Sequence, residues 1–89
     1  MVRIVYSNRA EKDAKKLSRS GAGLQRKAEE IIAILQENPF LDDPPYKLLV
    51  GNLYGFYSRR INHQHRLVYR VNKEEEVVKV YSMWGHYDD

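Results

Sequence analysis

The 89-residue chain contains no cysteine. This absence excludes a disulfide, a thiolate nucleophile and a cysteine-ligated zinc site. The chain also lacks any apolar run long enough to cross a membrane. The apolar run at its N-terminus, within residues 1–7, is too short for a signal peptide. We therefore expect a cytoplasmic protein with no membrane segment, folded as a single domain over residues 1–89.

Acidic side chains are absent from residues 44 to 73, although they occur before and after this segment. The formal net charge of +3 is modest, so the distribution of charge is more informative than its sum. The acid-free segment carries six cations: Lys47, Arg59, Arg60, Arg66, Arg70 and Lys73. A local basic stripe of this kind indicates a polyanionic partner.

The hydrophobic pattern predicts an α+β fold. Alternation over residues 2–6 predicts a strand, and Ser7 or Asn8 is positioned to cap a helix over about residues 9–18. A second helix, ending near residue 37, has a core-facing stripe of Leu24, Ala28, Ile31, Ile32 and Leu35. Further strands are predicted at 46–50, within 56–71 and at 77–83. We expect an antiparallel sheet with the two N-terminal helices packed on one face.

Residues 58–71 predict a β-hairpin rich in arginine. If the chain turns near His63, Arg60 lies opposite Arg66 and Ser58 lies opposite Val68. One face then joins Tyr57 to the apolar side chains of the second strand and can be buried, while the other gathers guanidinium groups. Like charges directly across two strands are unfavourable unless an anion lies between them, and the guanidinium fork matches phosphate. A solvated basic face without a role is the alternative.

Three histidines, His63, His65 and His86, are candidates for proton transfer. His63 and His65 form a His-x-His pair, but the sequence offers no third or fourth ligand at a supporting spacing. We therefore expect no metal and no cofactor. The pair His86-Tyr87 suggests phosphodiester chemistry beside the arginines. Metal-free cleavage of RNA requires a base, cations that stabilise the developing charge, and an acid for the leaving oxygen.

The stretch Gly55-Phe-Tyr-Ser-Arg-Arg-Ile-Asn-His-Gln-His-Arg-Leu-Val-Tyr69, with the terminal Trp84-Gly-His-Tyr87, resembles the YoeB/Txe family of bacterial toxins in the RelE superfamily. The resemblance implies a ribosome-dependent endoribonuclease that cuts mRNA in the A site by 2′-hydroxyl attack and inhibits translation. It implies as partners a YefM/Phd-type antitoxin, the 70S ribosome and mRNA. It further implies a homodimer, and contact with operator DNA only through the antitoxin.

By this resemblance, Arg60 and Arg66 hold the scissile phosphate, His86 is the general acid and Tyr87 supports substrate placement. Lys47 stands where the family glutamate is expected, so the identity of the general base is open: Lys47 serves as base or charge stabiliser, another group substitutes, or the enzyme is slow. The other side chains of the hairpin that we expect to bind RNA are Arg59, His63, His65 and Arg70.

Two other functions compete with the ribonuclease. The first is a toxin of the same scaffold that poisons DNA gyrase, as ParE-type proteins do. The second is a catalytically impaired relative that binds RNA or antitoxin without turnover. The complete set of two arginines and a His-Tyr pair favours the ribonuclease over the gyrase poison, whereas turnover separates it from the impaired relative.

Overall fold

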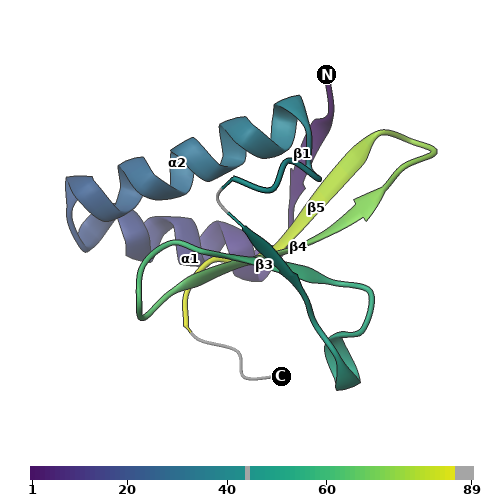
Figure 1. Cartoon of the computed structure of the whole chain (residues 1–89). Coiled ribbons are helices and arrows are strands. Elements are labelled where there is room, and N and C mark those ends of the chain that lie inside the picture. Colours follow the sequence, from purple (N-terminus) through teal and green to yellow (C-terminus); the bar gives the residue numbers. More distant parts are fainter. Residues whose placement is uncertain (44, 86–89) are drawn as a thin grey trace.

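The computed structural model describes residues 1–43 and 45–85. Two helices, α1 (Asn8–Arg19) and α2 (Ala22–Glu37), pack on one face of a five-stranded sheet (Figure 1). The order of the strands across the sheet is β1-β5-β4-β3-β2. The strands are β1 (Arg3–Tyr6), β2 (Tyr46–Leu48), β3 (Tyr57–Arg60), β4 (Arg66–Asn72) and β5 (Val77–Ser82), and a 3-10 turn, η1 (Gly51–Leu53), lies between β2 and β3. The predicted α+β architecture is confirmed.

The start of α1 follows from the side chain of Ser7. Its hydroxyl oxygen accepts a hydrogen bond from the backbone N–H of Ala10 at 3.0 Å, which satisfies one of the free amides of the first turn. The same hydroxyl donates to the carbonyl of Tyr81 at 2.7 Å. Ser7 is therefore the predicted helix cap and also joins the beginning of α1 to β5.

The expectation of an antiparallel sheet holds for β2 to β5 but is wrong for β1. That strand pairs with β5 in parallel, with Arg3 beside Val77 and Tyr6 beside Val80. Successive strands joined by short loops must be antiparallel, but β1 connects to the rest of the sheet through two helices. The alternation of residues 2–6 predicts a strand without fixing the direction of its neighbour.

The predicted register of the arginine hairpin is confirmed, because Arg60 pairs with Arg66 and Ser58 with Val68. Leu67 and Tyr69 face the helices and are fully buried in the main hydrophobic core. The helices contribute Ala10, Leu17, Ala28, Ile31 and Leu35 to that core. Burying one such large side chain stabilises the fold by about 1.5–3 kcal/mol. By strand alternation, Arg60 and Arg66 lie on the opposite face of the sheet.

Candidate functional site

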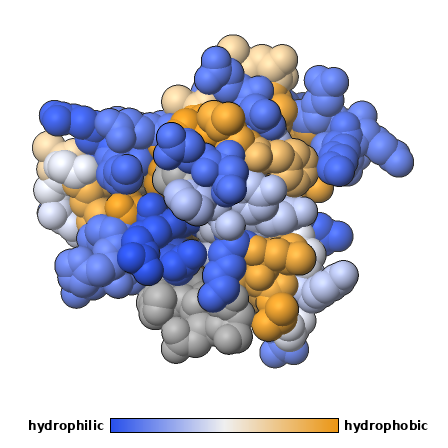
Figure 2. Space-filling view, in the orientation of Figure 1, coloured by the Kyte–Doolittle hydropathy of each residue, from blue (hydrophilic) through white to orange (hydrophobic). Residues whose placement is uncertain are grey.

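A basic groove of about 430 Å³ lies where α2, β2, β3 and β4 meet, and its lining residues are Lys27, Pro45, Tyr46, Lys47, Arg60, Ile61 and Arg66. Four of these side chains are cationic, and no residue of this lining set carries a carboxylate. Figure 2 shows a surface that is largely hydrophilic, with apolar side chains gathered in a few separate areas. The groove has the electrostatic character of a phosphate-binding site.

Adjacent strands position the cations of the groove. Arg60 on β3 lies directly across from Arg66 on β4. Lys47 on β2 pairs with Ser58 on β3. The hydroxyl of Ser58 accepts a hydrogen bond from Nε of Arg66 at 3.0 Å, which orients that guanidinium group. Three strands therefore bring a lysine and two arginines to one site. The hairpin register predicts the pairing of the two arginines, whereas the place of Lys47 comes from the pairing of β2 with β3.

The prediction that Arg59 binds RNA is wrong. Its side chain is fully buried, because Arg59 has the same parity on β3 as the core-facing Tyr57. The guanidinium group donates to the hydroxyl of Tyr69 at 3.0 Å, to the carbonyl of Pro39 at 3.0 Å and to the carbonyl of Leu41 at 2.6 Å. Arg59 therefore joins the sheet to the loop that follows α2.

Tyr69 has a shifted pKa within this buried network. Burial of its hydroxyl raises the pKa to about 12, because removal from water disfavours the phenolate. The hydrogen bond from Arg59 and the positive charge of that residue act in the opposite direction. Since the desolvation dominates, Tyr69 stays a neutral phenol that accepts the hydrogen bond from Arg59.

The other three residues predicted to bind RNA have different environments. His63, in the hairpin loop, and Arg70, near the middle of β4, are exposed. The guanidinium carbon of Arg70 lies 5.7 Å from the centroid of the Phe56 ring. His65 is only 9% exposed, so its imidazole belongs to the protein interior rather than to an RNA-binding surface. Its prediction as an RNA ligand fits this burial poorly.

His86 and Tyr87 lie outside the described residues, but the chain that leads to them is well defined. The backbone N–H of Met83 donates to a carboxylate oxygen of Asp13 at 3.0 Å. The backbone N–H of Gly85 donates to Nδ1 of His65 at 3.0 Å. The carbonyl of Gly85 accepts from the backbone N–H of Arg66, also at 3.0 Å. Gly85, the last described residue, is therefore hydrogen-bonded to Arg66, one of the two arginines of the groove.

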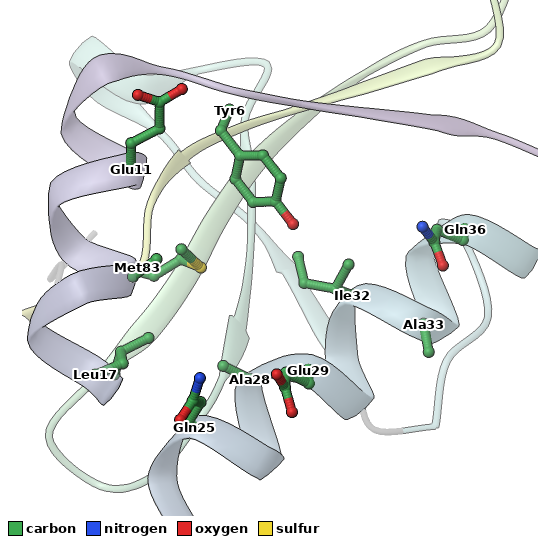
Figure 3. Close-up of a pocket in the computed structure, with 11 residues that line it drawn as sticks. Tyr6, Glu11, Leu17, Gln25, Ala28, Glu29, Ile32, Ala33, Gln36 and Met83 are labelled. Atoms are coloured by element: carbon green, nitrogen blue, oxygen red, sulfur yellow. The ribbon is translucent and has the colours of Figure 1, made fainter. Parts of the chain in front are cut away.

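A second cavity, of about 390 Å³, lies between the two helices (Figure 3). Tyr6 and Met83 point into the space between α1 and α2, and the remaining walls are largely apolar (Figure 3). The charged residues among its lining are Glu11 and Glu29, both of which are acidic. A phosphate group would be repelled there, so the basic groove is the better candidate of these two cavities for binding phosphate.

Sequence reasoning missed three residues that organise the site. Lys27 comes from α2, and nothing in the helical pattern distinguishes it from other exposed lysines. The hairpin register predicts the pairing of Ser58 with Val68, but the hydrogen bond between Ser58 and Arg66 depends on side-chain rotamers. Asp13 is a buried carboxylate among the apolar positions of α1. Its position beside Ala14 and Leu17, on the buried side of the helix, was the available signal.

Among the residues that the structure describes, no group of three or more His, Cys, Asp or Glu side chains is arranged to hold a metal ion. Within the same residues, neither helix has the length and apolar character needed to cross a membrane.

Similar folds and sequences define the class of this protein. A toxin from Agrobacterium tumefaciens described as YoeB/ParE superposes with a TM-score of 0.88 at 28% identity, covering 97% of this chain and 100% of the other. A Staphylococcus aureus YoeB-YefM toxin-antitoxin heterotetramer gives a TM-score of 0.81 at 33% identity, with 98% and 99% covered. A YoeB dimer from the same organism gives 0.79 at 32% identity, with 97% and 98% covered. The fold is that of the small RelE-like bacterial toxins.

A family model for the YoeB-like toxin of bacterial type II toxin-antitoxin systems matches residues 4–87. The chain belongs to this family and is the toxin of a type II toxin-antitoxin system. A Mycobacterium bovis Toxin YoeB is 40% identical over 50 residues, or 56% of this chain and 59% of that protein. The alignment with this curated relative therefore spans about three fifths of its length.

Proposed function

We propose that this toxin is a metal-independent endoribonuclease that cleaves mRNA in the ribosomal A site and so inhibits translation. The observation that supports this most directly is the pairing of Arg60 with Arg66 in a groove lined by two further cations, Lys27 and Lys47. Two guanidinium groups held side by side favour an anion between them. A phosphodiester that gains negative charge during cleavage fits this requirement.

In the proposed reaction, the 2′-hydroxyl of the RNA gives its proton to a base and bonds to the adjacent phosphorus, and the bond from phosphorus to the 5′-oxygen breaks. The products are a 2′,3′-cyclic phosphate and a free 5′-hydroxyl. Arg60 and Arg66 stabilise the charge that develops on the phosphate oxygens. His86 donates a proton to the departing 5′-oxygen, and Tyr87 supports placement of the substrate. The hydrogen bond from Arg66 to Gly85 supports these two roles, because His86 is the next residue along the chain.

Lys47 is the proposed base or charge stabiliser of the reaction. It pairs with Ser58, whose hydroxyl orients Arg66, so its backbone lies one strand from the phosphate-binding arginines. A Lys47→Ala variant that cleaves translated mRNA as fast as the parent would exclude this role.

We propose that the partner of the toxin is a YefM/Phd-type antitoxin, as in the Staphylococcus aureus YoeB-YefM complex. An acidic segment of the antitoxin that folds over the basic groove would neutralise Lys27, Lys47, Arg60 and Arg66 together. The Staphylococcus aureus YoeB dimer supports a homodimer for this chain. The ribosome and mRNA are the targets of the free toxin, which acts in the cytoplasm.

The test is to express this chain alone in bacteria and to map mRNA 5′ ends by primer extension. Cuts within translated codons are expected, and His86→Ala should abolish them while ribosome binding persists. Equal losses of cleavage and binding in that variant would contradict a proton-transfer role. Growth arrest with intact mRNA would instead point to gyrase or another target. A folded chain that causes neither arrest nor cleavage would identify the impaired relative.

A further inference from the structure

We propose that His65 is a positioning residue, which fixes the backbone of residues 83–85, the segment that precedes the proposed general acid, beside Arg66. The catalytic consequence of this role rests on the proposed ribonuclease function. The positioning itself rests on contacts between described residues. We call the three bonds that hold residues 83–85 the tail clamp: Asp13 to Met83, His65 to Gly85, and Arg66 to Gly85.

The clamp replaces the hydrogen bonds of a strand. β5 ends at Ser82, so the backbone of Met83, Trp84 and Gly85 has left the sheet ladder. Buried backbone amides need a partner, and here side chains supply it. Asp13 on α1 accepts from Met83, and His65 at the end of the hairpin loop accepts from Gly85. Two elements far apart in sequence therefore hold one short segment in place.

Ring stacking adds to the hold on this segment. The imidazole of His65 and the indole of Trp84 have centroids 4.1 Å apart and planes inclined by 30°. Nζ of Lys16 on α1 lies 5.8 Å from the centroid of the Trp84 ring. Gly85 itself has a φ of +99°, a left-handed conformation that other residues rarely adopt. The clamp therefore fixes both the side chain of Trp84 and the backbone that follows it.

The chemistry of the bond identifies the state of His65. A backbone amide can only donate, so Nδ1 must be the acceptor and must carry no proton. An imidazolium ion carries protons on both nitrogens and has no acceptor to offer. His65 is therefore neutral when it holds Gly85. Its Nδ1 lone pair is already used by the amide of Gly85.

The clamp couples the tail to the phosphate-binding arginines. Arg66 uses its backbone N–H to hold the carbonyl of Gly85, and it uses its side-chain Nε to reach Ser58. Gly85 directly precedes His86 in the sequence, so this anchor acts one position before the proposed general acid. An error of about 1 Å in the position of a reacting group can cost roughly 100-fold in rate. The clamp limits such displacement by restricting the movement of residues 83–85.

The test compares two substitutions at the same position. His65→Phe keeps an aromatic ring against Trp84 but removes the acceptor, whereas His65→Asn places a carbonyl oxygen where Nδ1 was. His63→Phe, at an exposed position of the same loop, is the matched control for hydrogen exchange. Three quantities are measured: the single-turnover cleavage rate on saturating programmed ribosomes, the affinity for those ribosomes, and the hydrogen exchange rate of the Gly85 amide.

We expect His65→Phe to lower the single-turnover rate by about 100-fold without changing the affinity, and to accelerate exchange at Gly85. His65→Asn should restore most of the rate and the protection, and His63→Phe should not alter exchange at Gly85. A parallel loss of affinity in the Phe variant would make His65 an RNA ligand and overturn the proposal. Equal rates for the Phe and Asn variants would also overturn it.

Hydrogen exchange separates failure of the clamp from failure of the proposed function. If the parent cleaves no RNA, faster exchange at Gly85 in the Phe variant, reversed in the Asn variant, still supports the clamp. Unchanged exchange in a folded Phe variant overturns it. If His65→Phe does not fold, His65→Leu and His65→Asn give the same comparison of an absent and a present acceptor.

Discussion

At the scale of single residues, Arg59 and Arg60 illustrate how one position along a strand decides between structure and function. Both belong to the basic motif, and composition does not distinguish them. On β3 they point to opposite faces, so Arg59 enters the core and Arg60 lines the basic groove. The parity of Arg59 with the core-facing Tyr57 predicts this burial. The prediction of an RNA contact failed because it gave charge more weight than parity.

The same substitution should lower stability at Arg59 and catalytic activity at Arg60. Arg59→Gln breaks charge-assisted hydrogen bonds to Tyr69 and to the loop after α2, so we expect it to lower the free energy of unfolding by about 3 kcal/mol. Arg60→Gln should change that free energy by no more than about 0.5 kcal/mol but slow RNA cleavage by roughly 100-fold. Urea unfolding and single-turnover cleavage measure both effects. Comparable stability losses in the two variants would contradict the assignment of Arg59 to the core.

Tyr69 should make stability fall in alkaline solution. Its pKa is raised to about 12 in the folded protein, against about 10 when unfolded. Its contribution is fully present below pH 10, because both states then bind the proton. Between pH 10 and 12 only the unfolded state ionises, so stability should fall by up to about 1.4 kcal/mol per pH unit from this group.

Urea unfolding at pH 9 to 11, compared between the parent and Tyr69→Phe, measures this contribution. The comparison cancels the titration of the other tyrosines. The variant should begin less stable, because Nε of Arg59 loses its acceptor, but its stability should fall less steeply with pH. Parallel pH profiles would show that the hydroxyl of Tyr69 does not retain its proton in the folded state.

At the scale of elements, the sequence predicted the helices and the hairpin well, because both carry their own periodicity. The stripe of α2 and the cap at Ser7 depend only on local spacing. The pairing of Arg60 with Arg66 follows from the position of a tight turn. The direction of β1 could not be predicted, since it depends on how two helices return the chain to the sheet. The approach of α2 to the groove could not be predicted either, because it also depends on how the helices pack on the sheet.

Lys27 is the contribution of α2 to the site, and it gives a prediction at this scale. Lys27→Gln should weaken RNA binding and slow cleavage without loss of stability, since it removes one of the four cations that line the groove. Arg26→Gln, an exposed position of the same helix outside the groove lining, is the control of equal charge. The affinity of each variant is measured as a function of salt concentration.

Each contact with single-stranded RNA contributes about −0.7 to the slope of log affinity against log salt. Lys27→Gln should therefore make the slope shallower by about that amount, and Arg26→Gln should leave it unchanged. Equal changes in the two variants would mean that net charge matters and that the groove has no special role.

At the scale of the whole molecule, the sheet separates two environments. The helices cover one face and form the main core with it, and the cations of the groove gather where the sheet meets α2 and β2. The tail clamp crosses this division, because Asp13 lies on α1 whereas Arg66 belongs to the hairpin. Stability and the geometry of the site are therefore linked through residues 83–85.

The parallel pairing of β1 with β5 has a consequence for folding of the protein during its synthesis. The hydroxyl of Ser7 bonds to the carbonyl of Tyr81, 74 positions later, so the first strand has no partner until the last one has been synthesised. A nascent chain can form α1, α2 and the hairpin early, since their contacts are local. It cannot complete the edge of its sheet or close the tail clamp before its final residues leave the ribosome. The edge of the sheet and the tail clamp are therefore completed together, late in synthesis.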